Sequence, residues 1–232
     1  MSPLELMRSR RTDLRLVIFD CDGVLVDSEP VSNRIVAEAL STLGWEMTAA
    51  EAERRFLGLT LTDMVPLIED RLGRRLPPGW KQALTERLVA ALAHEAVPVA
   101  GAYEALQGVS TLGLPWRVAS NSSHEEMQAK FGCIGLAAAV AGRLHSHRDV
   151  RRGKPAPDLF LAAAAAEGVG AEECVVIEDS VPGARAAATA GMDCLGYAPG
   201  SDGAALRAVG AVPFHSMFEL AALLAAAPRR AT

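Results

Sequence analysis

Three short apolar runs in this chain stop abruptly at polar residues. The runs and the residues that follow them are 14–19 with Asp20, 116–119 with Ser120, and 174–177 with Glu178 and Asp179. Short apolar runs that contain β-branched residues are typical of buried parallel strands. Because the carboxyl ends of parallel strands meet at one edge of a sheet, the polar residues are predicted to share one site at that edge.

Helical patterns lie between these runs. Residues 157–167 and 182–190 have helical composition, and Gly191 stands where a helix commonly ends. Strands that alternate with helices indicate an α/β fold with a doubly wound parallel sheet. Residues 194–197 and 211–214 are predicted to add two strands near the end of that sheet.

Residues 30–97 interrupt the alternation. They contain amphipathic helical stretches, such as 31–43 and 80–94, and no convincing strand. An all-helical insertion is therefore expected, with residues 97–101 as its return point and hinge. The core domain would consist of residues 1–28 and 99–232, and the inserted helical domain of residues 29–98.

Composition restricts the partners of this chain. Its net charge of -5 argues against a general nucleic-acid surface, so an anionic substrate must be held by local charge. The start of the sequence has no signal-peptide core, and no segment reaches the roughly 18 apolar residues of a membrane span. The four cysteines are scattered, which is typical of free, buried thiols in a reducing compartment. A cytoplasmic monomer that binds neither nucleic acid nor membrane is expected.

The residues predicted to converge carry several acids, one amine and one hydroxyl. They are Asp20, Asp22, Ser120, Lys154, Glu178 and Asp179. Crowded carboxylates repel one another unless a cation lies among them, and oxygen donors in an incomplete cage suit Mg²⁺. The cluster therefore indicates a magnesium site.

This set of residues suits phosphoryl transfer through a covalent intermediate. A carboxylate that attacks phosphorus forms an aspartyl-phosphate, and Asp20 is the candidate nucleophile. Asp22 is the candidate acid and base for the leaving oxygen and the hydrolytic water. Lys154 and Mg²⁺ would neutralise charge, while Ser120 and Asn121, with nearby backbone N–H groups, would hold the phosphate oxygens.

In their order and spacing these residues resemble the motifs of the haloacid dehalogenase superfamily along nearly the whole chain. The matching segments are 20–24, Ser120, 153–158 and 178–180. The resemblance implies a Rossmann-like core with a helical cap inserted after the first motif. It also implies Mg²⁺ bound by Asp20, the backbone carbonyl of Asp22 and Asp179, with Glu178 either a ligand or next to one.

Departures from the family pattern favour a phosphatase. The dehalogenases proper lack the second aspartate of the first motif, which is present here as Asp22. The cap histidine and arginine of β-phosphoglucomutase are replaced here by Ser32 and Leu61. Residues 54–60 and 119–123 resemble the branch that includes 6-phosphogluconate phosphatases. The chain is therefore interpreted as a Mg²⁺-dependent phosphatase of sugar phosphates. A phosphosugar mutase of the β-phosphoglucomutase type and a non-catalytic phosphate-sensing module are the alternatives.

Four cap residues are candidates for contacts with the substrate. They are Glu29, Arg54, Gly58 and Thr60. Charges on a helix usually face solvent, which is the competing interpretation for Arg54. Closure of a cap excludes water and large molecules alike, so the predicted partner is a small phosphorylated metabolite.

Some of these residues have competing interpretations. Lys154 is one of three lysines against 20 arginines, which suggests that a compact ammonium is needed there. Ser120 alone could instead cap the helix that begins near Ser123. His145 and His147 have no third metal-ligand partner nearby and are interpreted as surface residues of a loop.

Overall fold

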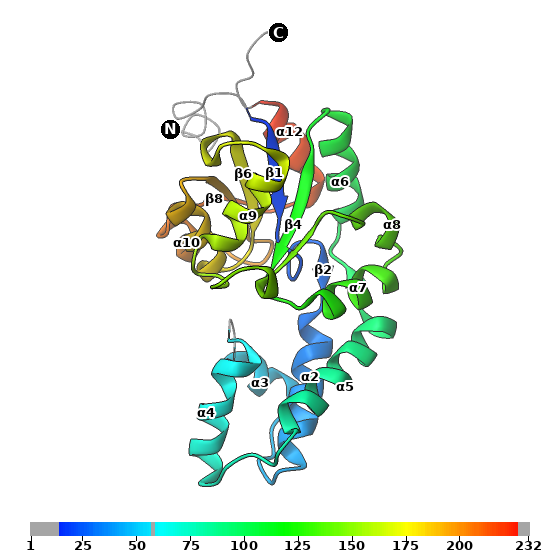
Figure 1. Ribbon diagram of the computed structural model, residues 1–232, viewed down its shortest axis with the longest axis vertical. Coiled ribbons are helices and arrows are strands. Elements are labelled where there is room, and N and C mark those ends of the chain that lie inside the picture. The colour runs from blue at the N-terminus through cyan, green and yellow to red at the C-terminus, as the bar shows by residue number, and fades with distance from the viewer. Residues whose placement is uncertain (1–13, 57–58, 227–232) are drawn as a thin grey trace.

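The computed structural model of the chain describes residues 14–56 and 59–226. Its main body is a six-stranded parallel sheet with the order β5-β4-β1-β6-β7-β8 (Figure 1). The strands are β1 (Leu16–Phe19), β4 (Trp116–Ser120), β5 (Leu144–Ser146), β6 (Cys174–Glu178), β7 (Asp193–Tyr197) and β8 (Val212–Phe214). The predicted α/β fold with a Rossmann-like parallel sheet is confirmed.

Both faces of the sheet are covered by helices because successive residues of a strand point to opposite faces. Val17 and Phe19 pack in one hydrophobic cluster, and Leu16 and Ile18 pack in another; all four side chains are fully buried. The first cluster includes residues of α6 (Ala102–Thr111), α7 (His124–Cys133), α8 (Ala137–Val140) and α12 (Leu220–Ala225). The second includes residues of α9 (Asp158–Glu167), α10 (Val181–Ala190) and α11 (Ala204–Arg207). Three short 3-10 helices complete this body: η1 (His147–Asp149), η2 (Ala171–Glu173) and η3 (Met217–Glu219).

A helical lobe interrupts the sheet after β1. It lies between β2 (Val26–Asp27) and β3 (Val97–Pro98), and its described helices are α2 (Glu29–Ser41), α3 (Ala49–Phe56), α4 (Leu61–Leu72) and α5 (Trp80–Glu95). Figure 1 shows this lobe, here called the cap, below the carboxyl ends of the strands. β2 and β3 pair antiparallel, with Val26 opposite Pro98 and Asp27 opposite Val97, so the chain enters and leaves the cap side by side. The predicted insertion of a helical cap is thus present, while its limits at residues 29–98 stay a prediction.

Three short strands were not predicted from the sequence. β2 and β3 have two residues each, and β5 has three, which is too short for a periodic pattern to register. The prediction that His145 lies in a loop is therefore wrong, because its Cα pairs with that of Ala119 at the edge of the sheet. His147 is exposed and begins η1.

Two predictions from composition have a structural counterpart. Cys21, Cys174 and Cys194 are buried as predicted, whereas Cys133 is half-buried because it is the last residue of α7. No helix within residues 14–56 and 59–226 combines the length and the apolar character needed to cross a membrane. The cytoplasmic location stays a prediction.

Candidate active site

The carboxyl edge of the sheet brings the sequence-predicted polar residues together. β1 lies between β4 and β6, with Phe19 in register with Val118 on one side and Ile177 on the other. Asp20 follows β1 directly, and Ser120 and Glu178 are the last residues of the two neighbouring strands. The three strand ends therefore stand next to one another.

Three carboxylates form the centre of this site. Asp20, Glu178 and Asp179 each offer an oxygen within 4.8 Å of the other two. Burial raises the pKa of Asp20 to about 7; the carboxylates of Glu178 and Asp22 act in the same direction, against the ammonium of Lys154. Burial also raises the pKa of Asp179 well above its usual range, and Glu178 and Asp20 add to this effect. Negative charge is thus crowded in a way that a divalent cation would relieve.

Lys154 is the cation that contacts this cluster. Its ammonium donates to Asp20 Oδ1 at 2.6 Å and to Glu178 Oε1 at 2.8 Å, and its side chain is only 4% exposed. Burial opposes the charged ammonium, but the carboxylates of Asp20 and Glu178 outweigh it and raise the pKa of Lys154. The lysine therefore stays charged beside Asp20.

Glu178 is held from several directions. Its Oε2 accepts from the backbone N–H of Ser180 at 2.7 Å and from the Ser180 hydroxyl at 2.8 Å, while Oε1 accepts from Lys154. The first turn of α10 passes so close that a Cβ on Gly183 would lie 1.6 Å from Glu178 Oε1. With both oxygens engaged, Glu178 fixes the position of the Lys154 ammonium.

Asp22 lies in a separate hydrogen-bond network. Its Oδ1 accepts from the Lys130 ammonium at 2.6 Å and from the Ser28 hydroxyl. Its Oδ2 accepts from the hydroxyls of Ser122 at 2.9 Å and Ser120 at 3.4 Å. Burial opposes ionisation of this carboxyl, but the Lys130 ammonium and the hydrogen bonds outweigh it and lower the pKa of Asp22.

Lys130 and Ser122 were not among the site residues predicted from the sequence. The scarcity of lysine that drew attention to Lys154 applies equally to Lys130, since the chain has only three lysines. Nothing local marks the residue, because it lies within α7 and reaches Asp22 only through the tertiary fold. Lysine scarcity was the one available signal.

Ser120 does not cap the helix that follows it. Ser123 has that role, since its hydroxyl accepts from the backbone N–H of Glu126 at 3.2 Å and its own N–H donates to the Glu126 carboxylate at 2.6 Å. The capping alternative for Ser120 is therefore wrong. Its hydroxyl instead accepts from the backbone N–H of Ser122 at 3.1 Å, within the network of Asp22.

Asn121 contacts the loop that carries Lys154. Its Oδ1 accepts from the backbone N–H of Lys154 at 2.9 Å, and its Nδ2 donates to the Lys154 carbonyl at 3.2 Å. A Cβ on Gly153 would lie 2.5 Å from Asn121 Oδ1, so the two loops are closely packed. Both ends of the side-chain amide thus orient the Lys154 backbone.

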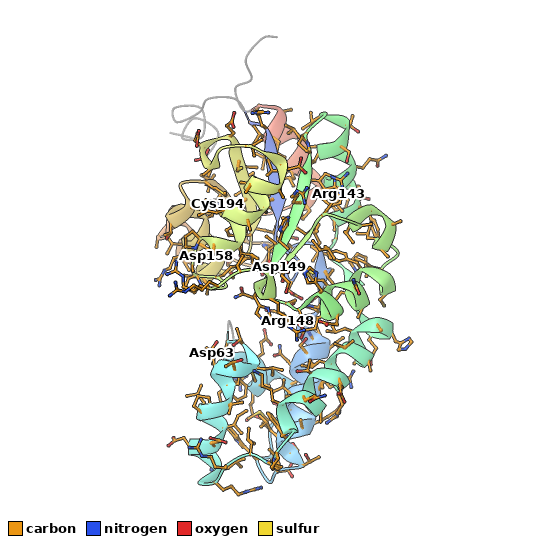
Figure 2. The ribbon with its side chains drawn as sticks, in the orientation of Figure 1. Asp63, Arg143, Arg148, Asp149, Asp158 and Cys194 are labelled. Carbon is orange, nitrogen blue, oxygen red and sulfur yellow. The ribbon has the colours of Figure 1, made fainter. Side chains whose placement is uncertain are left out.

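The cap candidates are less closely engaged. Glu29 is the exposed first residue of α2, and its charge adds to the effects that raise the pKa of Asp179. Arg54 is exposed on α3. Thr60 caps α4: its hydroxyl donates to Asp63 Oδ2 at 2.6 Å and accepts from the Asp63 N–H at 3.3 Å. Figure 2 places Asp63 at the end of the cap that faces the core. Gly58 lies outside the described residues.

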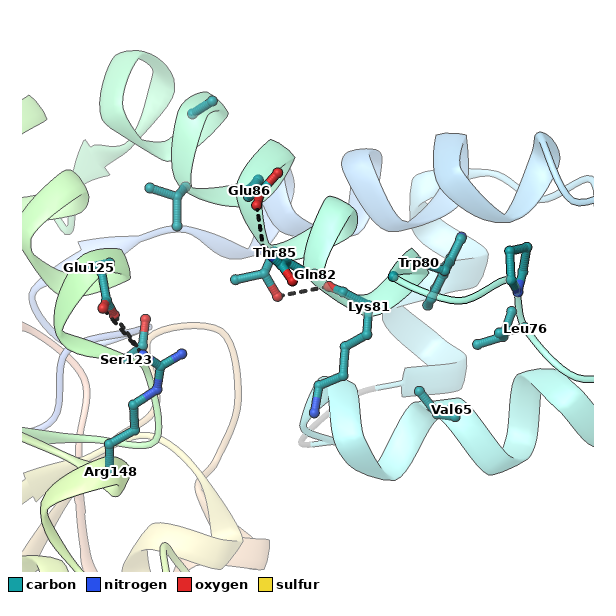
Figure 3. Close-up of a pocket in the computed structure, with 14 residues that line it drawn as sticks. Val65, Leu76, Trp80, Lys81, Gln82, Thr85, Glu86, Ser123, Glu125 and Arg148 are labelled. Carbon is teal, nitrogen blue, oxygen red and sulfur yellow. Dashed lines mark hydrogen bonds and ion pairs between the residues drawn. The ribbon is translucent and has the colours of Figure 1, made fainter.

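A cleft of about 980 Å³ is lined mainly by the cap, from α4 to α5, and on the core side by Ser123, Glu125 and Arg148. Lys81 projects into it from α5 and Arg148 from the core (Figure 3). Arg148 is paired with Glu125 at 3.0 Å, whereas Lys81 donates to the Thr62 hydroxyl at 2.6 Å. The remaining wall includes Val65, Leu76, Trp80, Val89 and Ser123. Asp20, Asp22, Glu178 and Asp179 do not line this cleft, and Ser123, next to Ser122 in the chain, is its nearest approach in sequence to the partners of Asp22.

The chain belongs to the haloacid dehalogenase-like hydrolases, whose family model matches residues 14–191. It is 32% identical over 183 residues to the 6-phosphogluconate phosphatase of Escherichia coli, covering 78% of this chain and 80% of the relative. Hexitol phosphatase A of Escherichia coli is 27% identical over 214 residues, covering 88% of this chain and 91% of that protein.

A solved structure has the same overall fold. It is a haloacid dehalogenase family hydrolase from Deinococcus radiodurans with bound phosphate and sodium, 32% identical, with a TM-score of 0.76 over 93% of this chain and 97% of the other. The predicted family is confirmed. The family model and the named phosphatases also bear out the prediction that this chain is a phosphatase enzyme.

Proposed function

We propose that this chain hydrolyses small sugar phosphate monoesters with Mg²⁺, through an aspartyl-phosphate on Asp20. The observation that carries the proposal is the contact of Asp20 with Lys154 inside the cluster completed by Glu178 and Asp179. A carboxylate nucleophile, a fixed ammonium and further acids suit attack on a phosphate. The phosphatases of sugar-derived phosphates among its relatives support the substrate class.

The donor set fits Mg²⁺. Asp20 and Asp179 supply carboxylate oxygens, and the backbone carbonyl of Asp22 would complete the protein ligands. Glu178 is better suited to support Lys154, because both its oxygens already accept hydrogen bonds. When bound, Mg²⁺ supplies positive charge to the phosphate oxygens and lowers the repulsion between the carboxylates.

In the first step a carboxylate oxygen of Asp20 attacks phosphorus. The bond from phosphorus to the ester oxygen breaks, and Asp22, which must be protonated for this step, gives its proton to the departing alcohol. Lys154 and the Ser120 hydroxyl hold the phosphate oxygens. In the second step Asp22 takes a proton from water, the water oxygen attacks phosphorus, and inorganic phosphate and the Asp20 carboxylate are released.

The cap supplies the binding site for the organic part of the substrate. We assign residues 29–98 to it, from the first residue of α2 to the last residue of β3, the strand by which the chain leaves the helical segment. The cleft between cap and core has room for a small sugar phosphate, and Lys81 extends into it. Cap residues would thus select a small phosphorylated metabolite. The Asn121 loop would position Lys154 for the phosphate.

The test is phosphate release with Mg²⁺ across a panel of phosphate esters. The panel contains 6-phosphogluconate, hexose phosphates, sugar alcohol phosphates and β-glucose 1-phosphate, the last also followed for conversion to glucose 6-phosphate. Release that is concentrated on a few sugar phosphates is expected. Isomer conversion without release would make the chain a mutase, and no reaction with any ester would favour a phosphate-sensing module.

A further inference from the structure

We infer that Lys130 is a positioning residue for Asp22, which it holds in place from α7 together with Ser122. The inference rests on the proposed function, in which Asp22 is the acid and base of the reaction. It adds a second lysine to the site, with a different aspartate as its partner.

Lys130, Ser122 and Asp22 form a closed triangle. The Lys130 ammonium donates to Asp22 Oδ1 at 2.6 Å and to the Ser122 hydroxyl at 2.8 Å. The Ser122 hydroxyl in turn donates to Asp22 Oδ2 at 2.9 Å. Lys130 therefore donates to one carboxylate oxygen of Asp22 and Ser122 to the other, and the hydrogen bond between Lys130 and Ser122 holds the two donors in place. This arrangement defines the orientation of the carboxylate plane.

The two buried lysines serve different carboxylates. Lys154 contacts Asp20 and Glu178, whereas the ion pair of Lys130 among the described residues is with Asp22. Both lysine side chains are 4% exposed. The nucleophile and the acid-base residue thus each have their own ammonium, so Lys130 is not needed to hold Asp20.

Stability alone is a poor explanation for Lys130. Desolvating an ammonium and a carboxylate costs several kcal/mol, and a buried ion pair often contributes no net stability over an apolar pair. A residue whose purpose was packing within α7 would be apolar, like its buried neighbours Met127 and Phe131. The orientation of Asp22 is the feature that this ammonium determines.

The same network connects Asp22 to the cap. Ser28 precedes α2, and its hydroxyl donates to Asp22 Oδ1 instead of capping the helix. α7, which carries Lys130, packs against the cap helix α5. Asp22, the proposed acid and base, is therefore held by Ser28 at the start of the cap and by Lys130 on α7, the core helix that contacts the cap.

The test is a double-mutant cycle with Lys130→Met and Asp22→Asn, measured on a sugar phosphate. Asp22→Asn alone is expected to lower kcat about 10²- to 10⁴-fold, the usual contribution of an acid-base residue. Lys130→Met is expected to lower kcat about 10- to 100-fold with little change in KM, as supporting residues around a reactive group do. In the Asp22→Asn background, Lys130→Met should cause no further loss. Lys130→Arg, which keeps the charge, should recover part of the activity.

A series of esters with leaving alcohols of increasing acidity gives a second readout. If Lys130 acts through Asp22, kcat/KM of Lys130→Met should depend more steeply on leaving-group acidity than that of the unmodified protein, as it should for Asp22→Asn. If Lys130 had only a structural role, Lys130→Met would lower kcat/KM by the same factor for every ester. That result, or an equal loss from Lys130→Met with and without Asp22, would overturn the inference.

Failure of the proposed function has a different signature. Turnover of Asp22→Asn equal to that of the unmodified protein would remove Asp22 from the mechanism, whatever Lys130 does. If Lys130→Met does not fold, Ser122→Ala takes its place in the cycle, because it removes the bridging hydroxyl without stranding an ion. If Ser122→Ala lowers kcat in the unmodified protein but not in the Asp22→Asn background, the inference is supported. If Ser122→Ala leaves kcat unchanged in the unmodified protein, the inference is contradicted.

Discussion

Asp179 lies against the backbone of Gly23 so closely that a Cβ on residue 23 would stand 1.9 Å from Asp179 Oδ2. Gly23 also has a φ of +71°, a left-handed conformation that side chains disfavour. The turn after Asp22 therefore lies in close contact with Asp179, the residue that follows β6. Residue 23 contributes to the site by having no side chain.

Gly23→Ala is expected to displace Asp179 and to lower both turnover and the apparent affinity for Mg²⁺. Gly113→Ala is the matched control, because Gly113 has the same φ of +71° and a Cβ added there would have no neighbouring atom within 4 Å. Both variants should lose about 1–2 kcal/mol of unfolding free energy from the backbone conformation. Only Gly23→Ala should also lose activity in a Mg²⁺ titration; equal activities of the two variants would contradict the role of the contact.

Asp20→Asn is expected to abolish turnover while the fold is retained. The amide keeps the shape of the carboxylate but cannot act as the nucleophile, so kcat should fall by about 10⁴-fold or more. Steady-state phosphate release and a thermal melt measure the two properties. Substantial turnover in this variant would remove Asp20 from the nucleophile's role.

Removal of divalent metal by a chelator is expected to abolish phosphate release, and added Mg²⁺ should restore it. Asp179→Asn should raise the Mg²⁺ concentration needed for half-maximal activity, because it removes one oxygen donor from the cluster of acids. Asp70→Asn, an exposed position of α4 in the cap, is the control and should leave that concentration unchanged. Hydrolysis that persists in the chelator would count against a metal-dependent mechanism.

Lys81→Met is expected to raise KM for a sugar acid phosphate more than for a neutral sugar phosphate. Lys81 reaches into the cleft, where its ammonium can attract a second negative group on the substrate. The expected increase is about 5-fold, the upper end for an exposed charge pair. Arg87→Met is the control, since Arg87 lies on the same helix but pairs with Glu38 of α2. An equal effect of Lys81→Met on acidic and neutral esters would exclude this role.

The residues at the strand ends could be predicted because the signal is local. An apolar run that stops at Asp20 or Glu178 reports both the strand and the edge on which its last residue lies. Lys130 gives no such signal, because a lysine within a helix has the same sequence appearance whether it faces solvent or a buried carboxylate. Its role depends on the packing of α7 against the sheet, which is a tertiary relationship.

The prediction of cap residues is limited for a related reason. The sequence makes Thr60 a candidate substrate contact, yet its hydroxyl is engaged at the start of α4 with Asp63. Side chains such as Thr serve as helix caps and as ligand contacts with equal ease, and only the local geometry separates the two uses. Lys81, in contrast, lies on the wall of a cleft to which residues of α4, α5 and the core contribute, and this arrangement exists only in the folded chain.

The antiparallel pairing of Val26 and Asp27 with Val97 and Pro98 has an evolutionary consequence. Because both crossings lie side by side, the intervening segment can be exchanged as one cassette without reconnecting any strand of the six-stranded sheet. Under the proposed function, in which the cap binds the organic part of the substrate, selectivity and reactivity would lie on separately inheritable stretches of chain. A lineage can acquire a new preference for substrates by replacing the cassette while it keeps its chemistry unaltered.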